Sequence, residues 1–291
     1  MKIKYYILLT ILLFSLYAKS DSPLTVDNIY TDKGKLKLET NITYSNYEQN
    51  EINVAEPITV QTTTNSFINI PTSIRKSQNN ADVLIGTIGF RYGLTGQTDV
   101  YGNISSLYEE NRLFNGIDEY KTKNDYLSDA NLGVSHSFLP EGQDYGVVGF
   151  LETSVYKKML DKSSKFNSGI IGMTAYTVND PIVLSLTSSY HFNNKLDTEM
   201  GKYNPSNYFV IHPSVAFAAN EQISLMAGIQ WINRYAEQIN QQNISARNTA
   251  TYAKLGLGFS VSNNTTINAS TRFKISGNNN SELNFNVIHS L

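Results

Sequence analysis

The chain has 291 residues, no cysteine and a formal net charge of −2, from 23 Lys and Arg against 25 Asp and Glu. The lack of cysteine excludes disulfides, thiolate metal sites and a lipid-modified N-terminal cysteine, and the balanced charge gives no basis for nucleic-acid binding. Charged residues make up 16% of the chain, whereas soluble domains carry roughly 25%. Together with 19 Tyr and 13 Phe, this composition is compatible with a membrane β-barrel that has a wet interior.

Residues 1–20 have the features of a cleaved secretory signal peptide. Lys2 and Lys4 are followed by an apolar run over 5–17, and Ala18-Lys19-Ser20 supplies small residues for cleavage before Asp21 or, alternatively, after Ala18. The apolar run is shorter than the ~20 residues of a membrane-spanning helix, so an N-terminal anchor helix is the weaker alternative. The mature chain is therefore expected to cross the inner membrane and to lack a transmembrane helix.

A polar, periplasmic lead-in over 21–34 is followed by a barrel domain over 35–291 in which apolar and polar residues alternate with a period of two. Leu36 and Leu38, for example, alternate with Lys37 and Glu39. This period is that of a strand, and the runs of about ten residues suit a membrane-crossing strand. The predicted strands are 36–45, 81–92, 98–108, 130–138, 147–155, 168–177, 182–192, 209–217, 223–235, 253–261, 267–275 and 283–291.

The connections between these strands alternate in length. Short turns are predicted near 94, 141, 179, 220 and 263, among them Asn179-Asp180-Pro181, whose residues favour tight turns. Longer polar connections are expected over 46–80, with an extension hairpin near 58–70, and over 109–127, 157–167, 193–207 and 238–247, with a short loop near 278. Outer-membrane barrels have short periplasmic turns and longer outer loops. A β-sandwich is the alternative, but its strands would be nearer five or six residues.

Aromatic residues on the apolar faces fall into two groups at the two ends of the strands. Such belts are favoured at membrane interfaces. The group near the short turns is Phe90, Tyr92, Phe138, Phe217 and Phe259, and the group toward the long connections is Tyr44, Tyr108, Tyr190, Phe192, Trp231, Tyr235 and Phe273.

The opposite faces of the strands are expected to line a lumen and carry charges of both signs. In one interpretation cross-strand pairs, such as Lys274 with Glu282 or Arg272 with Glu39, brace a narrow interior. In the other the same residues form a polar pore lining, since twelve strands lie between a filled eight-stranded and an open sixteen-stranded barrel. The candidate lumen-lining residues are Lys37, Glu39, Arg91, Glu152, Gln230, Arg234, Lys254, Arg272, Lys274 and Glu282.

Signals for catalysis are weak. The chain has no Gly-x-Ser-x-Gly motif, and its four His are not spaced as metal ligands. His191 is expected near the outer mouth of the lumen. We therefore expect no catalytic residue, no cofactor and no metal site.

Several segments resemble the outer-membrane family named for the meta-pathway of phenol degradation. The similar segments are Arg91-Tyr92-Gly93-Leu94-Thr95 with Thr98, Tyr176 to Leu184 with Tyr190, Asn204-Pro205-Ser206, and Ala218 to Leu225. The resemblance implies a monomeric barrel that passes small, hydrophobic or aromatic molecules. The turn at Pro140 and the final Leu291, where such barrels end in Phe, depart from the family pattern.

The sequence thus predicts an all-β protein: a transmembrane, antiparallel, up-and-down β-barrel of about twelve strands in the bacterial outer membrane. Its predicted function is passive passage of small solutes. The first alternative is a non-conducting barrel that acts through its outer loops, and the second is a lipid-modifying enzyme. Expected partners are outer-membrane lipid, a small-molecule solute and the barrel-assembly machinery during insertion.

Overall fold

The computed structural model describes residues 31–49, 58–70, 78–114, 118–139, 144–159, 162–198, 201–276 and 280–291. The predicted signal peptide and its cleavage site lie outside these residues. Within the part of the chain that the structure describes, no helix is long and apolar enough to cross a membrane.

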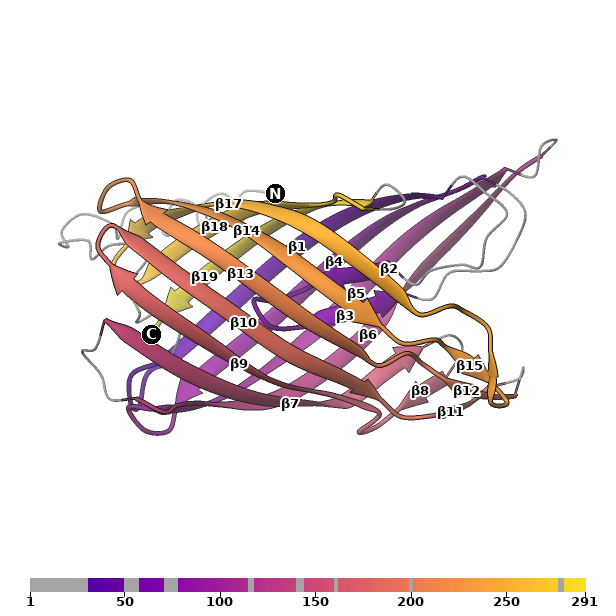
Figure 1. Ribbon diagram of the computed structural model, residues 1–291, viewed down its shortest axis with the longest axis horizontal. Helices are drawn as coiled ribbons and strands as arrows, with labels where there is room; N and C mark the ends of the chain where they lie inside the picture. Colours follow the sequence, from indigo (N-terminus) through magenta and orange to yellow (C-terminus); the bar gives the residue numbers. More distant parts are fainter. Residues whose placement is uncertain are drawn as a thin grey trace, which may run out of the picture.

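Twelve long antiparallel strands form a closed barrel (Figure 1). Sequential strands are neighbours around the wall, and the ring is closed by pairing of β1 with β19, while β6 also pairs with β7. The predicted up-and-down barrel is confirmed. The strands are β1 (Leu36–Gln49), β4 (Gln78–Gly93), β5 (Thr98–Phe114), β6 (Glu119–Ser137), β7 (Tyr145–Met159), β9 (Ser168–Asn179), β10 (Ile182–Asn193), β13 (Tyr208–Ala218), β14 (Ile223–Arg234), β17 (Asn248–Ser262), β18 (Thr265–Lys274) and β19 (Asn280–Ser290).

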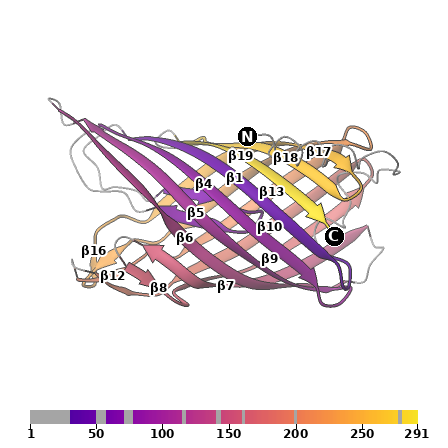
Figure 2. The same cartoon turned by 180° about the vertical axis from the view of Figure 1, so that it is seen from behind.

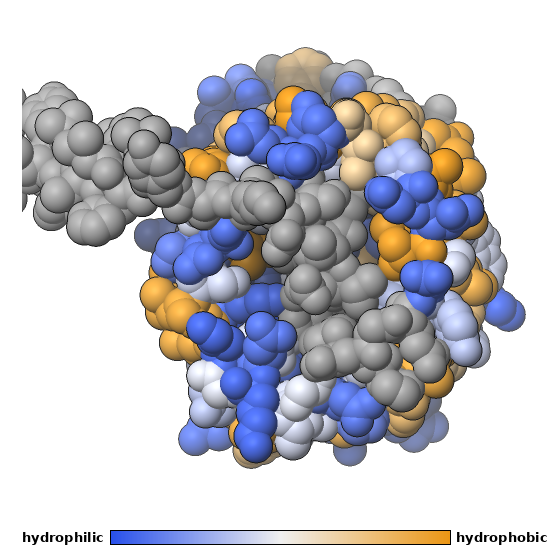
Figure 3. Space-filling model, turned by 90° about the vertical axis from the view of Figure 1, so that its left-hand side faces the viewer, coloured by the Kyte–Doolittle hydropathy of each residue, from blue (hydrophilic) through white to orange (hydrophobic). Residues whose placement is uncertain are grey.

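The outer surface of the barrel is apolar because every second side chain of a strand points outward. On β10, Ile182, Leu184 and Leu186 are 41%, 51% and 50% exposed, and similar large side chains surround the whole wall. Figure 3 shows hydrophobic residues on the outer wall and hydrophilic residues around the rim at the end that carries the C-terminus. An apolar surface of this extent is stable in lipid rather than in water.

Short turns and the C-terminus share one end of the barrel (Figures 1 and 2). The Leu291 N–H donates to the Leu36 carbonyl at 2.8 Å, and Lys33 forms a bridge with Gly93. A Cβ at Gly93 would lie 2.2 Å from the Asp32 carbonyl oxygen, so this close approach requires glycine. The end of the lead-in therefore packs on the β4–β5 turn.

At the other end the strands continue beyond the predicted limits. The sequence predicted a polar loop over 109–127, but β5 extends to Phe114 and β6 begins at Glu119. The expected loops at 157–167, 193–207 and 238–247 likewise contain short strands: β8 (Lys162–Ser164), β11 (Leu196–Thr198), β12 (Gly201–Asn204), β15 (Gln238–Ile239) and β16 (Gln242–Asn243).

These extensions were missed because strands above the membrane have no lipid-facing side, so their residues do not alternate between apolar and polar. Cross-strand ion pairs support them instead, including Arg112 with Asp82, and Lys123 with Glu110 at 3.2 Å. The strands β11, β12, β15 and β16 form a small separate sheet. The outer end is therefore built from paired strands more than from loops.

Candidate functional site: the barrel lumen

A short hairpin lies inside the barrel, where Figure 1 shows it enclosed by the wall. It consists of β2 (Ile58–Gln61) and β3 (Phe67–Ile70), and all four residues of β2 are buried. We call residues 58–70 the lumen hairpin. The sequence predicted this hairpin as an extension within the connection over 46–80, whereas the structure places it against the inner wall. Side-chain contacts with the inner wall on several sides hold it inside.

One face of the lumen hairpin is apolar. The register pairs Ile58 with Ile70 and Val60 with Ile68, which places all four on one face. They form a buried cluster with inward-pointing residues of β1, β4 and β5: Tyr47, Ala81, Val83, Ile85 and Leu107. Full burial of such a side chain contributes about 1.5–3 kcal/mol. The inner wall is thus hydrophobic where β1, β4 and β5 contact the lumen hairpin.

The other face of the lumen hairpin is polar and meets charged residues of β14, β17, β18 and β19. Arg272 donates to the Thr59 carbonyl and also binds Glu282, its cross-strand partner. Arg234 donates to the Thr59 hydroxyl. The Lys254 ammonium lies 3.1 Å from the Gln61 side-chain oxygen.

Two further contacts join the lumen hairpin to β7 and β10. The Ser66 hydroxyl donates to the Glu152 carboxylate at 2.8 Å, and the Phe67 ring meets the His191 ring edge-on with centroids 5.3 Å apart. Glu152 is 3% exposed. The lumen hairpin is therefore bonded across the width of the barrel.

The structure brings most of the candidate lumen-lining residues to this hairpin. Glu152, Arg234, Lys254, Arg272 and Glu282 contact it, and Gln230 accepts a hydrogen bond from Arg272. Their effect on solutes remains a prediction.

The other four candidates lie elsewhere. Glu39 accepts from Asn286 at 2.7 Å rather than from Arg272, and Arg91 pairs with Asp99 at 3.2 Å. Lys37 lines a small cavity with Glu39, Arg91 and the tip of the hairpin. Lys274 is half-buried at the end of β18.

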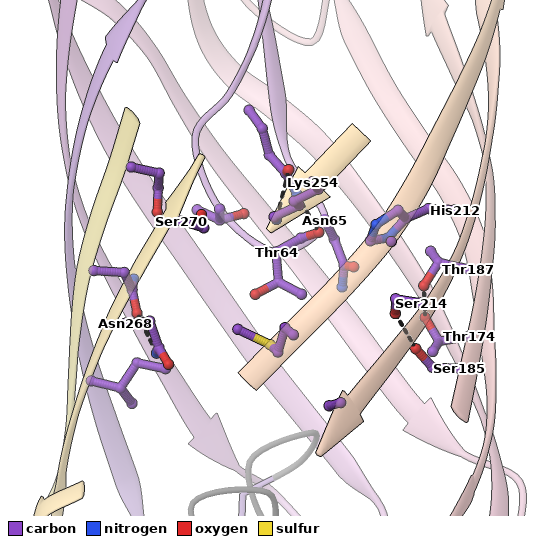
Figure 4. A pocket seen from close by; sticks show the side chains of 18 of the residues that line it. Thr64, Asn65, Thr174, Ser185, Thr187, His212, Ser214, Lys254, Asn268 and Ser270 are labelled. Atoms are coloured by element: carbon purple, nitrogen blue, oxygen red, sulfur yellow. Dashed lines mark hydrogen bonds between the residues drawn. The ribbon is translucent and has the colours of Figure 1, made fainter. Parts of the chain in front are cut away.

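Below the hairpin tip the lumen contains a chamber of about 360 Å³ (Figure 4). It extends toward the short turns, since Val183, Ala216 and Ser224 are among its lining residues. One side is formed by Thr174, Ser185, Thr187 and Ser214, which we call the hydroxyl wall. Another is formed by Asn41, Asn268, Asn284 and Asn286, which we call the amide wall. None of these eight residues is among the candidate lumen-lining residues, because all of them are uncharged.

The histidines do not form a recognisable catalytic group. The Ser189 hydroxyl and His191 Nε2 are 3.0 Å apart, but His191 is 3% exposed, stacked on Tyr208 and covered by Phe67. His136 and His289 contact Thr98 and Thr265 at 2.9 Å. Among the described residues, no group of three or more His, Asp or Glu could hold a metal ion. The absence of catalysis stays a prediction.

Comparisons with known proteins agree with the fold. An outer-membrane channel from Pseudomonas putida F1 aligns with 89% of this chain and 96% of its own at a TM-score of 0.62 and 9% identity. The translocator domain of the autotransporter NalP from Neisseria meningitidis aligns over 89% of both chains, with a TM-score of 0.48 and 12% identity. The P. putida toluene transporter TodX covers 94% of this chain and 95% of its own, with a TM-score of 0.42 and 11% identity.

Only the first of these similarities is close enough to establish a shared fold. No family model and no curated protein matches the sequence, so the resemblance to the meta-pathway family remains a resemblance. The closed barrel and its apolar outer wall define the class: the chain is a bacterial outer-membrane β-barrel.

Proposed function

We propose that this barrel is a passive channel for small solutes. The observation that carries the proposal is the chamber of about 360 Å³ below the lumen hairpin. A barrel whose only role is structural gains nothing from an open chamber in its lumen, whereas a solute path requires open space. The resemblance to the meta-pathway family implies that these small solutes are hydrophobic or aromatic.

The proposed setting follows from the fold class. The partners are outer-membrane lipid around the wall, a small solute in the lumen and the barrel-assembly machinery during insertion. The proposed state is a monomer, exported by the signal peptide of residues 1–20.

The second candidate function is a non-conducting barrel that acts through its outer end. The lumen hairpin favours it, because both faces of this hairpin are bonded to the wall. A channel must therefore pass solutes around the hairpin or move it.

Solute flux into liposomes distinguishes the two candidates. The variant replaces residues 58–70 by Gly and Ser, and its folding is checked by heat-dependent mobility in gels. A channel passes small solutes in the native form, and the variant raises the flux by roughly tenfold, as expected for a cleared twelve-stranded lumen. If neither form passes any solute while both are folded, the channel proposal is wrong.

A further inference from the structure

We propose that the chamber selects neutral, hydroxyl-rich solutes of the size of a monosaccharide or small polyol. This inference rests on the proposed channel function, whose solute class it names. It differs from the aromatic or hydrophobic solutes that the family resemblance implies.

The hydroxyl wall offers hydrogen bonds of both kinds. Thr174 and Thr187 are 2.9 Å apart, and Ser185 and Ser214 are 2.6 Å apart. Each hydroxyl has one donor and two acceptor positions. A pair that shares one hydrogen keeps a second hydrogen and further lone pairs for a ligand. A solute hydroxyl, which also donates and accepts, fits this wall.

Asn268 of the amide wall lies across the chamber from the hydroxyl wall (Figure 4). The amide wall as a whole lies on β1, β18 and β19, nearly opposite β9, β10 and β13 in the order of strands. Asn284 donates to Asn41 at 3.0 Å, and Asn268 donates to Asn286 at 3.3 Å. These contacts fix the side chains in place, so a solute between the walls meets positioned donors and acceptors on two sides.

The charged groups of the chamber already have partners. Arg272 is paired with Glu282, Arg91 with Asp99, and Glu39 accepts from Asn286. A charged solute would lose its hydration and would have to compete with these contacts. Lys254, whose contact is the neutral Gln61, is the cation most able to bind an anion, so an anionic sugar belongs in the test.

Two aromatic rings lie along the side of the chamber. The ring of Phe150 lies over Gly172 and that of Tyr176 lies over Gly146, since a Cβ at either glycine would be 2.3 Å from the ring. Both rings line the chamber beside a glycine that leaves room for them. An aromatic ring in the lining offers an apolar contact for the C–H groups of a sugar ring.

The volume agrees with this class of ligand. About 360 Å³ is near the lower limit of small-molecule sites, ~300–1,000 Å³. A monosaccharide fits with some of its water, whereas a long chain or a peptide does not.

The test is liposome swelling with three sugars of equal size: glucose, glucuronate and glucosamine, which are neutral, anionic and cationic. We expect glucose to enter about tenfold faster than either charged sugar. Equal rates, or faster entry of glucuronate through Lys254, overturn the inference but leave the channel proposal standing. If no sugar enters through the native barrel or through the variant with residues 58–70 replaced by Gly and Ser, the channel proposal itself fails.

The walls are tested by removing hydrogen-bonding groups at nearly constant volume. Thr187→Val in the hydroxyl wall and, independently, Asn268→Leu in the amide wall should each reduce the preference for glucose at least about threefold. Thr177→Val is the matched control, since Thr177 points outward on β9. If both wall variants fold and keep the native preference, the walls do not select the solute.

Discussion

The two halves of the lumen are made of the same strands but are filled differently. We call the half toward the long connections the outer half and the half toward the short turns the inner half. On β13 the outer half carries the inward side chains Tyr208 and Val210, and the inner half carries Ser214. On β14 the corresponding residues are Ile232 and Gly228. The outer half holds the lumen hairpin and the inner half holds the chamber. On these two strands, inward side chains are larger around the lumen hairpin than around the chamber, so side-chain size along a strand contributes to where this barrel is open.

The largest change in the difference between the two halves is expected when the lumen hairpin is released from the wall. Arg272→Met removes the bonds to the Thr59 carbonyl and to Glu282, and leaves a carboxylate that is 3% exposed without its cation. Loss of one partner of a buried ion pair costs about 3–5 kcal/mol. We expect a lower free energy of unfolding in urea and a higher conductance in planar bilayers.

Two variants control this prediction. Arg247→Met removes an exposed guanidinium that binds Asn233 at the outer end and should change neither quantity. Adding Glu282→Gln to Arg272→Met should recover part of the stability, because the unpaired charge is gone. Unchanged stability and conductance in Arg272→Met would show that the charged cluster does not hold the hairpin.

The second way is to give the inner half the bulk of the outer half. Ser185→Phe places an aromatic ring in the chamber and should lower solute flux by roughly tenfold, because the passage is obstructed. Leu184→Phe is the matched control, since Leu184 is the next residue and points to lipid. Native flux through a folded Ser185→Phe barrel would mean that solutes do not cross the chamber.

The smallest expected effect concerns charge in the outer half. Glu152→Gln removes a negative charge and should shift ion selectivity toward anions, and Arg234→Gln should shift it toward cations, each about twofold. Reversal potentials in a salt gradient measure both. Lys121→Gln, an exposed site on β6, serves as the control. If Glu152→Gln and Arg234→Gln leave the potential unchanged, ions do not pass these two residues.

The barrel could be predicted from the sequence because lipid imposes a period of two on every strand that crosses it. Ile182, Leu184 and Leu186 are an example. The lumen hairpin could be predicted as a hairpin, but not placed. Apolar and polar residues alternate in its strands too. Its apolar face could equally pack at the edge of a sheet or against the inner wall of the barrel. The contacts that place it join residues far apart in sequence, such as Thr59 with Arg272, 213 positions away.

The charged residues of the candidate site could be predicted from the sequence, but the small uncharged residues that line the chamber could not. Arg272 and Glu282 stand out on a polar face, and they do meet across β18 and β19. Asn268 and Ser214 look like ordinary polar strand residues. They become a chamber lining only because the lumen hairpin stops above them, which no local pattern records.

The path of the chain through the lumen hairpin has a consequence for the order of assembly. The hairpin follows β1, yet its polar face is held by β14, β17, β18 and β19, up to 221 positions later in the chain. Contacts between such distant segments form late in folding. The hairpin therefore cannot be fully anchored on its polar side until the last strands join, and the step that completes the ring of strands is also the step that completes the anchoring of the hairpin inside it.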